Sequence, residues 1–211
     1  MQLREALNDI AEIRAQIERT ESSRGLRSLA VSFSSLLVFS GAIAGQLILA
    51  DPGSVLGFVA VWATVAVASL IGALAEMWLR ASRSTSRTAR GFVWQAHRAM
   101  AIQLLPSFVV GAVLTAVFVT RPGMSWILPG MWGLIYGLGL WSCRQHLPQV
   151  ANWVAVYYVV VGALCLAYSN AMTDLNSGLA NWQMVAIFGV GQLLLGFLIY
   201  WKLERSDEKE D

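Results

Sequence analysis

The sequence predicts an all-α fold, a polytopic bundle of six transmembrane helices with a cytoplasmic amphipathic helix ahead of the first crossing. Apolar residues make up 56% of the 211-residue chain and charged residues 13%, whereas a soluble domain carries about 25% charged residues. Six apolar stretches reach the length of about 20 residues that a bilayer core requires. Lysine and arginine are also distributed very unevenly among the segments that join these stretches.

The first element, residues 1–24, is predicted to be an amphipathic helix. Its apolar residues recur in alternating steps of three and four, at Leu3, Ala6, Ile10, Ile13 and Ile17. The rest of the helix is charged, and acidic residues outnumber arginines, so its attraction to anionic lipid is weak. We interpret Leu3, Ile10, Ile13 and Ile17 as a contact stripe. Three occupants remain open, namely the protein's own bundle, a second copy of the chain and a cytoplasmic protein partner.

The six apolar stretches follow as one membrane domain, residues 25–201. The predicted spans are residues 29–50, 54–79, 99–120, 124–143, 150–169 and 180–201. Helix breakers or polar residues separate them, for example Pro52-Gly53 and Pro122-Gly123. Only the second span contains a charged residue, Glu76. Residues 202–211 are predicted to be a charged cytoplasmic tail.

The orientation follows from the placement of positive charge. Fourteen of the fifteen Lys and Arg residues fall on the side that holds both termini, and Arg121 alone falls on the other. Because short positive segments stay in the cytoplasm, both termini are predicted to be cytoplasmic. The protein is predicted to lie in the inner membrane of a bacterium. The segment 80–98, with five arginines and no acid, anchors two spans at anionic headgroups, and Gly91–Arg98 is expected to form an interfacial turn. No nucleic-acid partner is expected, because this segment offers no reading helix.

Three residues within the spans mark a candidate pathway for a solute through the bundle. Gln192 lies near the middle of the sixth span, where its amide needs a partner, and the candidates by residue type are Ser69, Ser107, Thr115 and Tyr136. Pro106 and Pro129 remove backbone hydrogen bonds from the third and fourth spans and are therefore candidate hinges. Interrupted helices mark binding sites in many transporters.

A group of polar residues is predicted at the inner ends of the second, third and fourth spans: Glu76, His97, Cys143 and His146. Glu76 can pair with Arg80 one turn later, which favours ordinary interfacial side chains. The alternative is a metal or catalytic site, because Cys and His three residues apart can share a metal. Motifs typical of soluble enzymes are absent from the sequence, and we predict no catalytic residues, no metal and no cofactor.

Small residues four positions apart predict close helix contacts. They occur at Gly41 and Gly45, Ala68 and Gly72, Gly133 and Gly137, and along Ser107, Gly111 and Thr115. Such patterns indicate contact between helices, either inside one chain or between copies.

The acidic segment LREALNDIAEIRAQI, the six spans and the closing segment GVGQLLLGFLIYWKLER together resemble small bacterial multispan membrane proteins of uncharacterised function. This resemblance covers the length of the chain and implies no activity. The residues favour a non-catalytic sensor, regulatory or assembly component that binds a partner or itself. A carrier for a small neutral or apolar solute is the second interpretation, and a membrane enzyme or metal-binding protein is the third.

Overall fold

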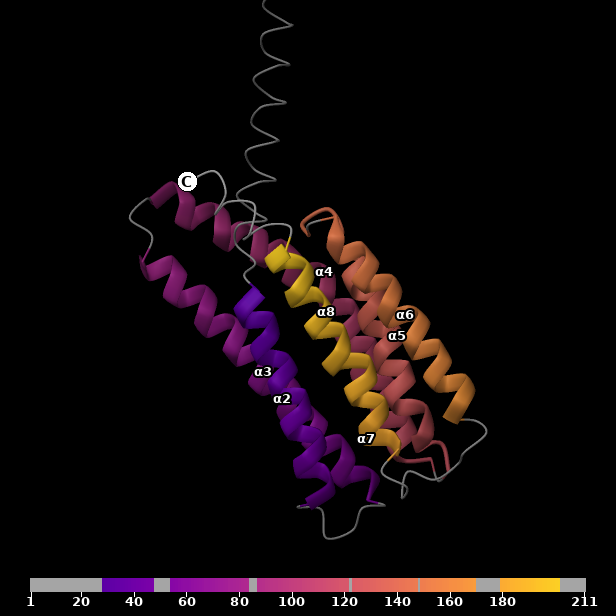
Figure 1. The fold of residues 1–211 in the computed structure, drawn as a ribbon. Coiled ribbons are helices and arrows are strands. Elements are labelled where there is room, and N and C mark those ends of the chain that lie inside the picture. The colour runs from indigo at the N-terminus through magenta and orange to yellow at the C-terminus, as the bar shows by residue number, and fades with distance from the viewer. Residues whose placement is uncertain are drawn as a thin grey trace, which may run out of the picture.

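The computed structural model describes residues 28–47, 54–83, 87–121, 123–147, 149–169 and 179–201. Within these ranges every regular element is a helix, and the helices lie side by side in one bundle (Figure 1). The predicted contact stripe of Leu3, Ile10, Ile13 and Ile17 lies outside the described residues, as does the tail 202–211.

Helices of very different length make up the bundle. In chain order they are α2 (Ser28–Leu47), α3 (Val55–Arg83), α4 (Arg87–Val119), the 3₁₀ turn η1 (Ser125–Ile127), α5 (Leu128–Ser142), α6 (Val150–Ser169), α7 (Leu179–Met184), the π-helical turn η3 (Val185–Gly189) and α8 (Val190–Ile199). Four segments are long and apolar enough to cross a membrane, namely Val55–Glu76, Arg98–Val119, Ala151–Ser169 and Asn181–Ile199. The chain is therefore a helical, multi-pass membrane protein.

The expected turn at Gly91–Arg98 is wrong, because this segment belongs to α4. Helix α3 continues to Arg83 and α4 already begins at Arg87, so both helices extend beyond their apolar segments. The physical reason is that hydropathy reports burial in lipid and not helix formation. Residues 87–98, which precede the apolar segment of α4, contain no proline. Their arginine, alanine and glutamine residues favour a helix even in water.

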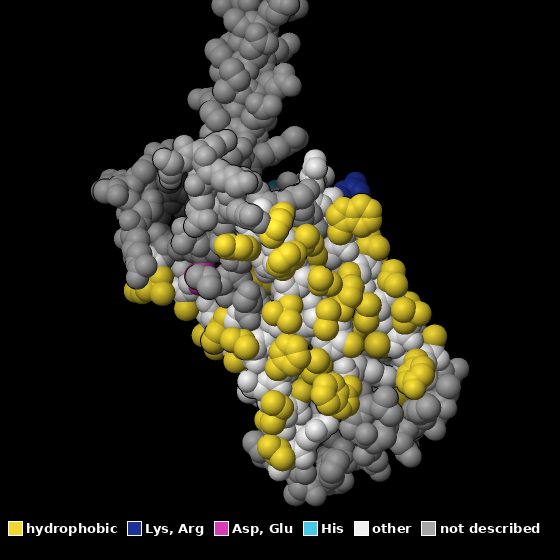
Figure 2. Space-filling view, in the orientation of Figure 1, with side chains coloured by type: hydrophobic (Ala, Val, Ile, Leu, Met, Phe, Trp, Pro, Cys, Tyr) yellow, Lys and Arg dark blue, Asp and Glu magenta, His cyan; other side chains and the backbone are white. Residues whose placement is uncertain are grey.

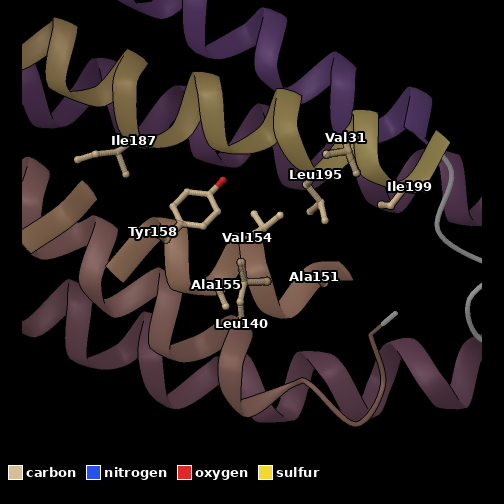
Figure 3. Close-up of a cluster of buried hydrophobic side chains, with 9 residues drawn as sticks. All are labelled: Val31, Leu140, Ala151, Val154, Ala155, Tyr158, Ile187, Leu195 and Ile199. Atoms are coloured by element: carbon tan, nitrogen blue, oxygen red, sulfur yellow. The ribbon is translucent and has the colours of Figure 1, made fainter. Parts of the chain in front are cut away.

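Two clusters of buried apolar side chains form the core. One cluster joins α2, α5, α6, η3 and α8 and is drawn in Figure 3: Val31, Leu140, Ala151, Val154, Ala155, Tyr158, Ile187, Leu195 and Ile199. The other joins α2, α3, α5 and α7 through Val38, Phe58, Trp62, Leu128, Met131 and Met184. Phe188 packs against both clusters, so η3 lies where the two parts of the core meet.

The closest helix contact joins α5 to α6 and is made by glycines. A Cβ atom at Gly162 would lie 2.8 Å from the Gly130 carbonyl oxygen and 2.9 Å from the Leu134 nitrogen. Likewise, a Cβ atom at Gly137 would lie 3.0 Å from the Ala155 carbonyl oxygen. Backbone therefore meets backbone here, and only glycine leaves enough room for it.

The outside of the bundle is apolar, as a lipid-facing surface must be. Figure 2 shows hydrophobic side chains over most of the described surface on one side of the molecule, between its two ends. The most apolar window of Arg98–Val119 has none of its residues buried inside the protein, whereas half of the corresponding window in Asn181–Ile199 is buried. Helix α4 thus lies at the edge of the bundle and the last helix lies inside it.

Candidate functional site at the centre of the bundle

Gln192 lies in α8 and donates a hydrogen bond from Nε2 to the hydroxyl oxygen of Tyr136 in α5, over 3.3 Å. Tyr136 is one of the four partners that residue type allows, and the fold selects it because α5 lies against the last helix. The bond joins two helices in the middle of the segment Asn181–Ile199. In a membrane, a bond of this kind contributes on the order of 1 kcal/mol to helix association.

Aromatic rings surround this pair. Tyr136 meets Tyr158 of α6 edge to face with 4.8 Å between ring centroids, and it meets Phe188 of η3 at 5.6 Å. Tyr158 also contacts Phe188 and Tyr157, at 5.7 and 5.8 Å. Edge-to-face contacts of this kind add to the energy of packing. We call Tyr136, Tyr157, Tyr158, Phe188 and Gln192 the central cluster.

The last helix is interrupted next to the central cluster by the π-helical turn η3, Val185–Gly189. A π turn widens the helix and directs some carbonyl groups toward groups outside it. Two side chains from neighbouring helices use these carbonyls. Tyr157 of α6 donates its hydroxyl to the Ala186 carbonyl, and Ser35 of α2 donates Oγ–H to the Gly189 carbonyl over 3.0 Å. The wide turn is therefore held from two sides.

Tyr158 is the least exposed member of the cluster, with 0% of its surface accessible. Figure 3 shows its hydroxyl pointing toward α8. There, a Cβ atom at Gly191 would lie 2.7 Å from that hydroxyl oxygen, so the glycine is what allows the tyrosine to reach this position. Within the described part of the chain the hydroxyl has no hydrogen-bond partner.

Other buried polar groups connect helices outside the central cluster. Trp62 of α3 donates its indole N–H to Oδ1 of Asn181 in α7 over 3.0 Å, and Trp132 of α5 donates to Thr115 of α4 over 2.8 Å. Both tryptophans contact Phe58, which lies between them. These bonds tie the outer helices α3 and α4 to the rest of the bundle.

The small-residue stripe of α4 faces α5 in the same chain. A Cβ atom at Gly139 would lie 3.0 Å from Ser107 Oγ, and one at Gly111 would lie 3.9 Å from Ile135. Thr115 continues this face through its bond with Trp132. The other stripes also make internal contacts: Gly41 lies against Val65, and Gly72 against Phe33. The contacts predicted from spacing thus occur inside one chain.

Cys143 and His146, from the predicted inner-face group, both reach α4. The fully buried thiol of Cys143 lies 3.7 Å from the Met100 carbonyl oxygen, and His146 Nε2 lies 3.3 Å from Nε2 of Gln103. Gln103 was not singled out from the sequence, because its spacing matches no motif. These two contacts hold the turn after α5 against α4.

The other two members of that group lie elsewhere or outside the described side chains. Glu76 is half-buried in α3, and His97 belongs to α4 with a side chain outside the described part. Among the described side chains, no group of three or more His, Cys, Asp or Glu residues could hold a metal ion. Glu76, Cys143 and His146 therefore do not form a shared metal site.

Neither predicted hinge proline breaks its helix. Pro129 lies in the first turn of α5, where its missing N–H would have no helical partner in any case. Pro106 is exposed within α4, which continues through it. The helix next to the central cluster is irregular at η3 instead, and apart from Gly189 the sequence of η3 carries no signal that distinguishes it from an ordinary helix.

No protein-family model matches this chain, and neither a curated protein nor a solved structure matches it.

Proposed function

We propose that the protein is a non-catalytic component of the bacterial inner membrane, with a sensor, regulatory or assembly role. It binds a partner protein, or a second copy of itself, through the apolar stripe of its N-terminal helix. In this proposal the chain crosses the membrane six times, and the bias of Lys and Arg toward one side assigns both termini to the cytoplasm.

One observation carries this proposal: buried and half-buried polar side chains of the described bundle bind neighbouring helices. Four such side chains each donate a hydrogen bond to a neighbouring helix: Gln192, Trp62, Ser35 and Tyr157. Hydrogen bonds of this kind between helices fix the helices in place. The hydrogen bonds inside the bundle thus support a structural role for its interior. We therefore assign the binding of other proteins to the ends of the chain.

The six-pass arrangement rests on four long apolar segments and two shorter helices. Helix α2 has 20 residues and is therefore about 30 Å long, which matches a bilayer core. Helix α5 has 15 residues, and the preceding turn η1 lengthens it toward the same span. The charge distribution of the loops supports cytoplasmic termini.

The test is the mass of the protein part of the complex in mild detergent. We compare the unaltered chain with the double substitution Ile10→Asp and Ile13→Asp, which places two charges in the apolar stripe. The expected result is that the spans still insert while a dimer or a co-purifying protein is lost. Equal association of both chains would contradict the proposal.

A matched control adds the same two charges on the opposite side of the helix. Ala11→Asp and Ala15→Asp lie away from the stripe at helical spacing, so association is expected to survive. Loss of association in this control as well would show that added charge, and not the stripe, is responsible.

A carrier for a small neutral or apolar solute is the second candidate. The Tyr158 hydroxyl and the π turn beside it favour this candidate, since both place polar atoms deep in the bundle. If the protein is a carrier, liposomes that contain it should take up small neutral solutes faster than empty liposomes do. Flux equal to that of empty liposomes would count against transport.

A further inference from the structure

The Tyr158 hydroxyl is an unusual group for the centre of a membrane bundle. It is fully buried, and it has no hydrogen-bond partner within the described residues. The only other buried side-chain atom there in this condition is Oε1 of Gln103, whose amide already binds His146 through Nε2. Tyr158 by contrast makes no bond at all through its polar atom.

A buried hydroxyl without a partner is costly, because its hydrogen bonds to water are lost and nothing replaces them. Nearly all such groups in native proteins are satisfied, and those that lack a protein partner usually bind an internal water molecule or a ligand. The lipid around this bundle increases the cost of leaving the hydroxyl without a hydrogen bond, since bulk water is remote from a fully buried group.

The polar side chains that surround Tyr158 in the central cluster already make hydrogen bonds of their own. The hydroxyl of Tyr157 donates to Ala186 and the amide N–H of Gln192 points to Tyr136. Gly191 presents only its backbone to the Tyr158 hydroxyl, since a Cβ atom would come within 2.7 Å. The hydroxyl end of the ring therefore occupies the space that a side chain at position 191 would take.

We propose that Tyr158, with the neighbouring Tyr136–Gln192 pair, forms a binding site for one small, uncharged molecule that can donate and accept hydrogen bonds. The hydroxyl of Tyr158 donates to this molecule or accepts from it, and the Tyr136–Gln192 pair supplies the further polar atoms. Water is the smallest member of this class, and short alcohols and amides such as urea are larger members.

The molecule is uncharged because the cluster offers no counter-charge. Its members are three tyrosines, one phenylalanine and one glutamine, and an unpaired charge at this depth is strongly disfavoured. It is small because Tyr158 lies in a cluster of buried core side chains, of which Val154 and Ile187 are at most 2% exposed. This inference does not depend on the regulatory role proposed above.

The first test is a pair of substitutions that each remove one hydroxyl. Tyr158→Phe keeps the ring and removes the proposed contact, while Tyr157→Phe removes the hydroxyl that binds Ala186. Tyr157→Phe loses its bond to Ala186 in any case, whereas Tyr158→Phe loses a hydrogen bond only if a molecule is bound. With a molecule bound, each variant should lower the midpoint of thermal unfolding by about 2–4 °C. An unchanged or raised midpoint for Tyr158→Phe alone would overturn the proposal, because removing a truly unpartnered hydroxyl relieves its cost.

The second test requires no substitution. An experimental structure of the whole protein, at a resolution that shows ordered water, should contain a non-protein peak about 2.5–3.2 Å from the Tyr158 hydroxyl oxygen. A one-atom peak that is unchanged after soaking in urea identifies water, and a peak that grows to the shape of urea identifies a solute site. Absence of a peak under both conditions would overturn the proposal.

Discussion

Helices α4 and α5 follow each other in the chain and pack together, yet they occupy opposite environments. The segment Arg98–Val119 of α4 has the length and composition of a membrane span, and none of its most apolar window is buried in the protein. Helix α5 is only 15 residues long, and eight of those residues are buried. Four of the buried residues are glycines, at 130, 133, 137 and 139.

This difference shows what hydropathy measures in a membrane protein. A helix that faces lipid needs large apolar side chains around most of its surface, and α4 has them. A helix covered by other helices needs small residues instead, because close approach of the backbones supplies the attraction. Helix α5, which is covered by other helices, is thus less clearly recognised as a membrane span by length and hydropathy than α4.

The largest expected loss of stability comes from a substitution at Gly162, in the contact between α5 and α6, and Gly111 serves for comparison. Gly162→Ala places a Cβ atom 2.8 Å from the Gly130 carbonyl oxygen, which forces α5 and α6 apart. We expect the free energy of unfolding in detergent to fall by about 1–3 kcal/mol. Gly111→Ala is the control, since its Cβ atom lies at an ordinary 3.9 Å from Ile135 and should leave stability unchanged or slightly higher. Equal effects of the two substitutions would contradict the backbone contact.

A smaller effect is expected at the central cluster. Gln192→Leu and Tyr136→Phe each remove one side of the hydrogen bond between α8 and α5, and each should cost about 0.5–1 kcal/mol of unfolding free energy. The double substitution should cost less than the sum of the single ones, because both remove the same bond. Strictly additive losses would show that the two groups do not interact.

The smallest effect is expected on the outer face of α4. Leu105 is 59% exposed, so Leu105→Ala should change the free energy of unfolding by less than about 0.5 kcal/mol. Lipid replaces the lost contacts without forming a cavity. A loss as large as that of Gly162→Ala would mean that this face is covered by a second molecule.

Much of the fold follows from the sequence alone. The span predicted at 150–169 coincides with α6, because polar residues flank a run that is apolar apart from Asn152 and its last residue, Ser169. The contacts of Ser107, Gly111 and Thr115 also follow from spacing, although the sequence left open which helix they meet. The long extension of α4 was missed because its first residues are polar, and polarity says little about helix formation.

The central cluster was predicted only in part. Gln192 could be recognised because an amide within an apolar run must find a partner, but the choice of Tyr136 depends on how α5 lies against α8. Gly162 was missed because the residues four positions away, Tyr158 and Leu166, are large, so no pattern of small residues includes it. The π turn depends on bonds from Ser35 and Tyr157, which come from distant parts of the chain.

The most direct test of this account asks whether α5 crosses the membrane. Met124 and Gln145 are exposed residues on either side of this helix, so cysteines are introduced there one at a time in a chain with Cys143→Ala and Cys165→Ala. The account predicts that a membrane-impermeant maleimide labels the Met124→Cys chain in intact cells and the Gln145→Cys chain only after the membrane is opened. Labelling of both from the same side would contradict α5 as a membrane-spanning centre of the bundle, and the reversed pattern would contradict cytoplasmic termini.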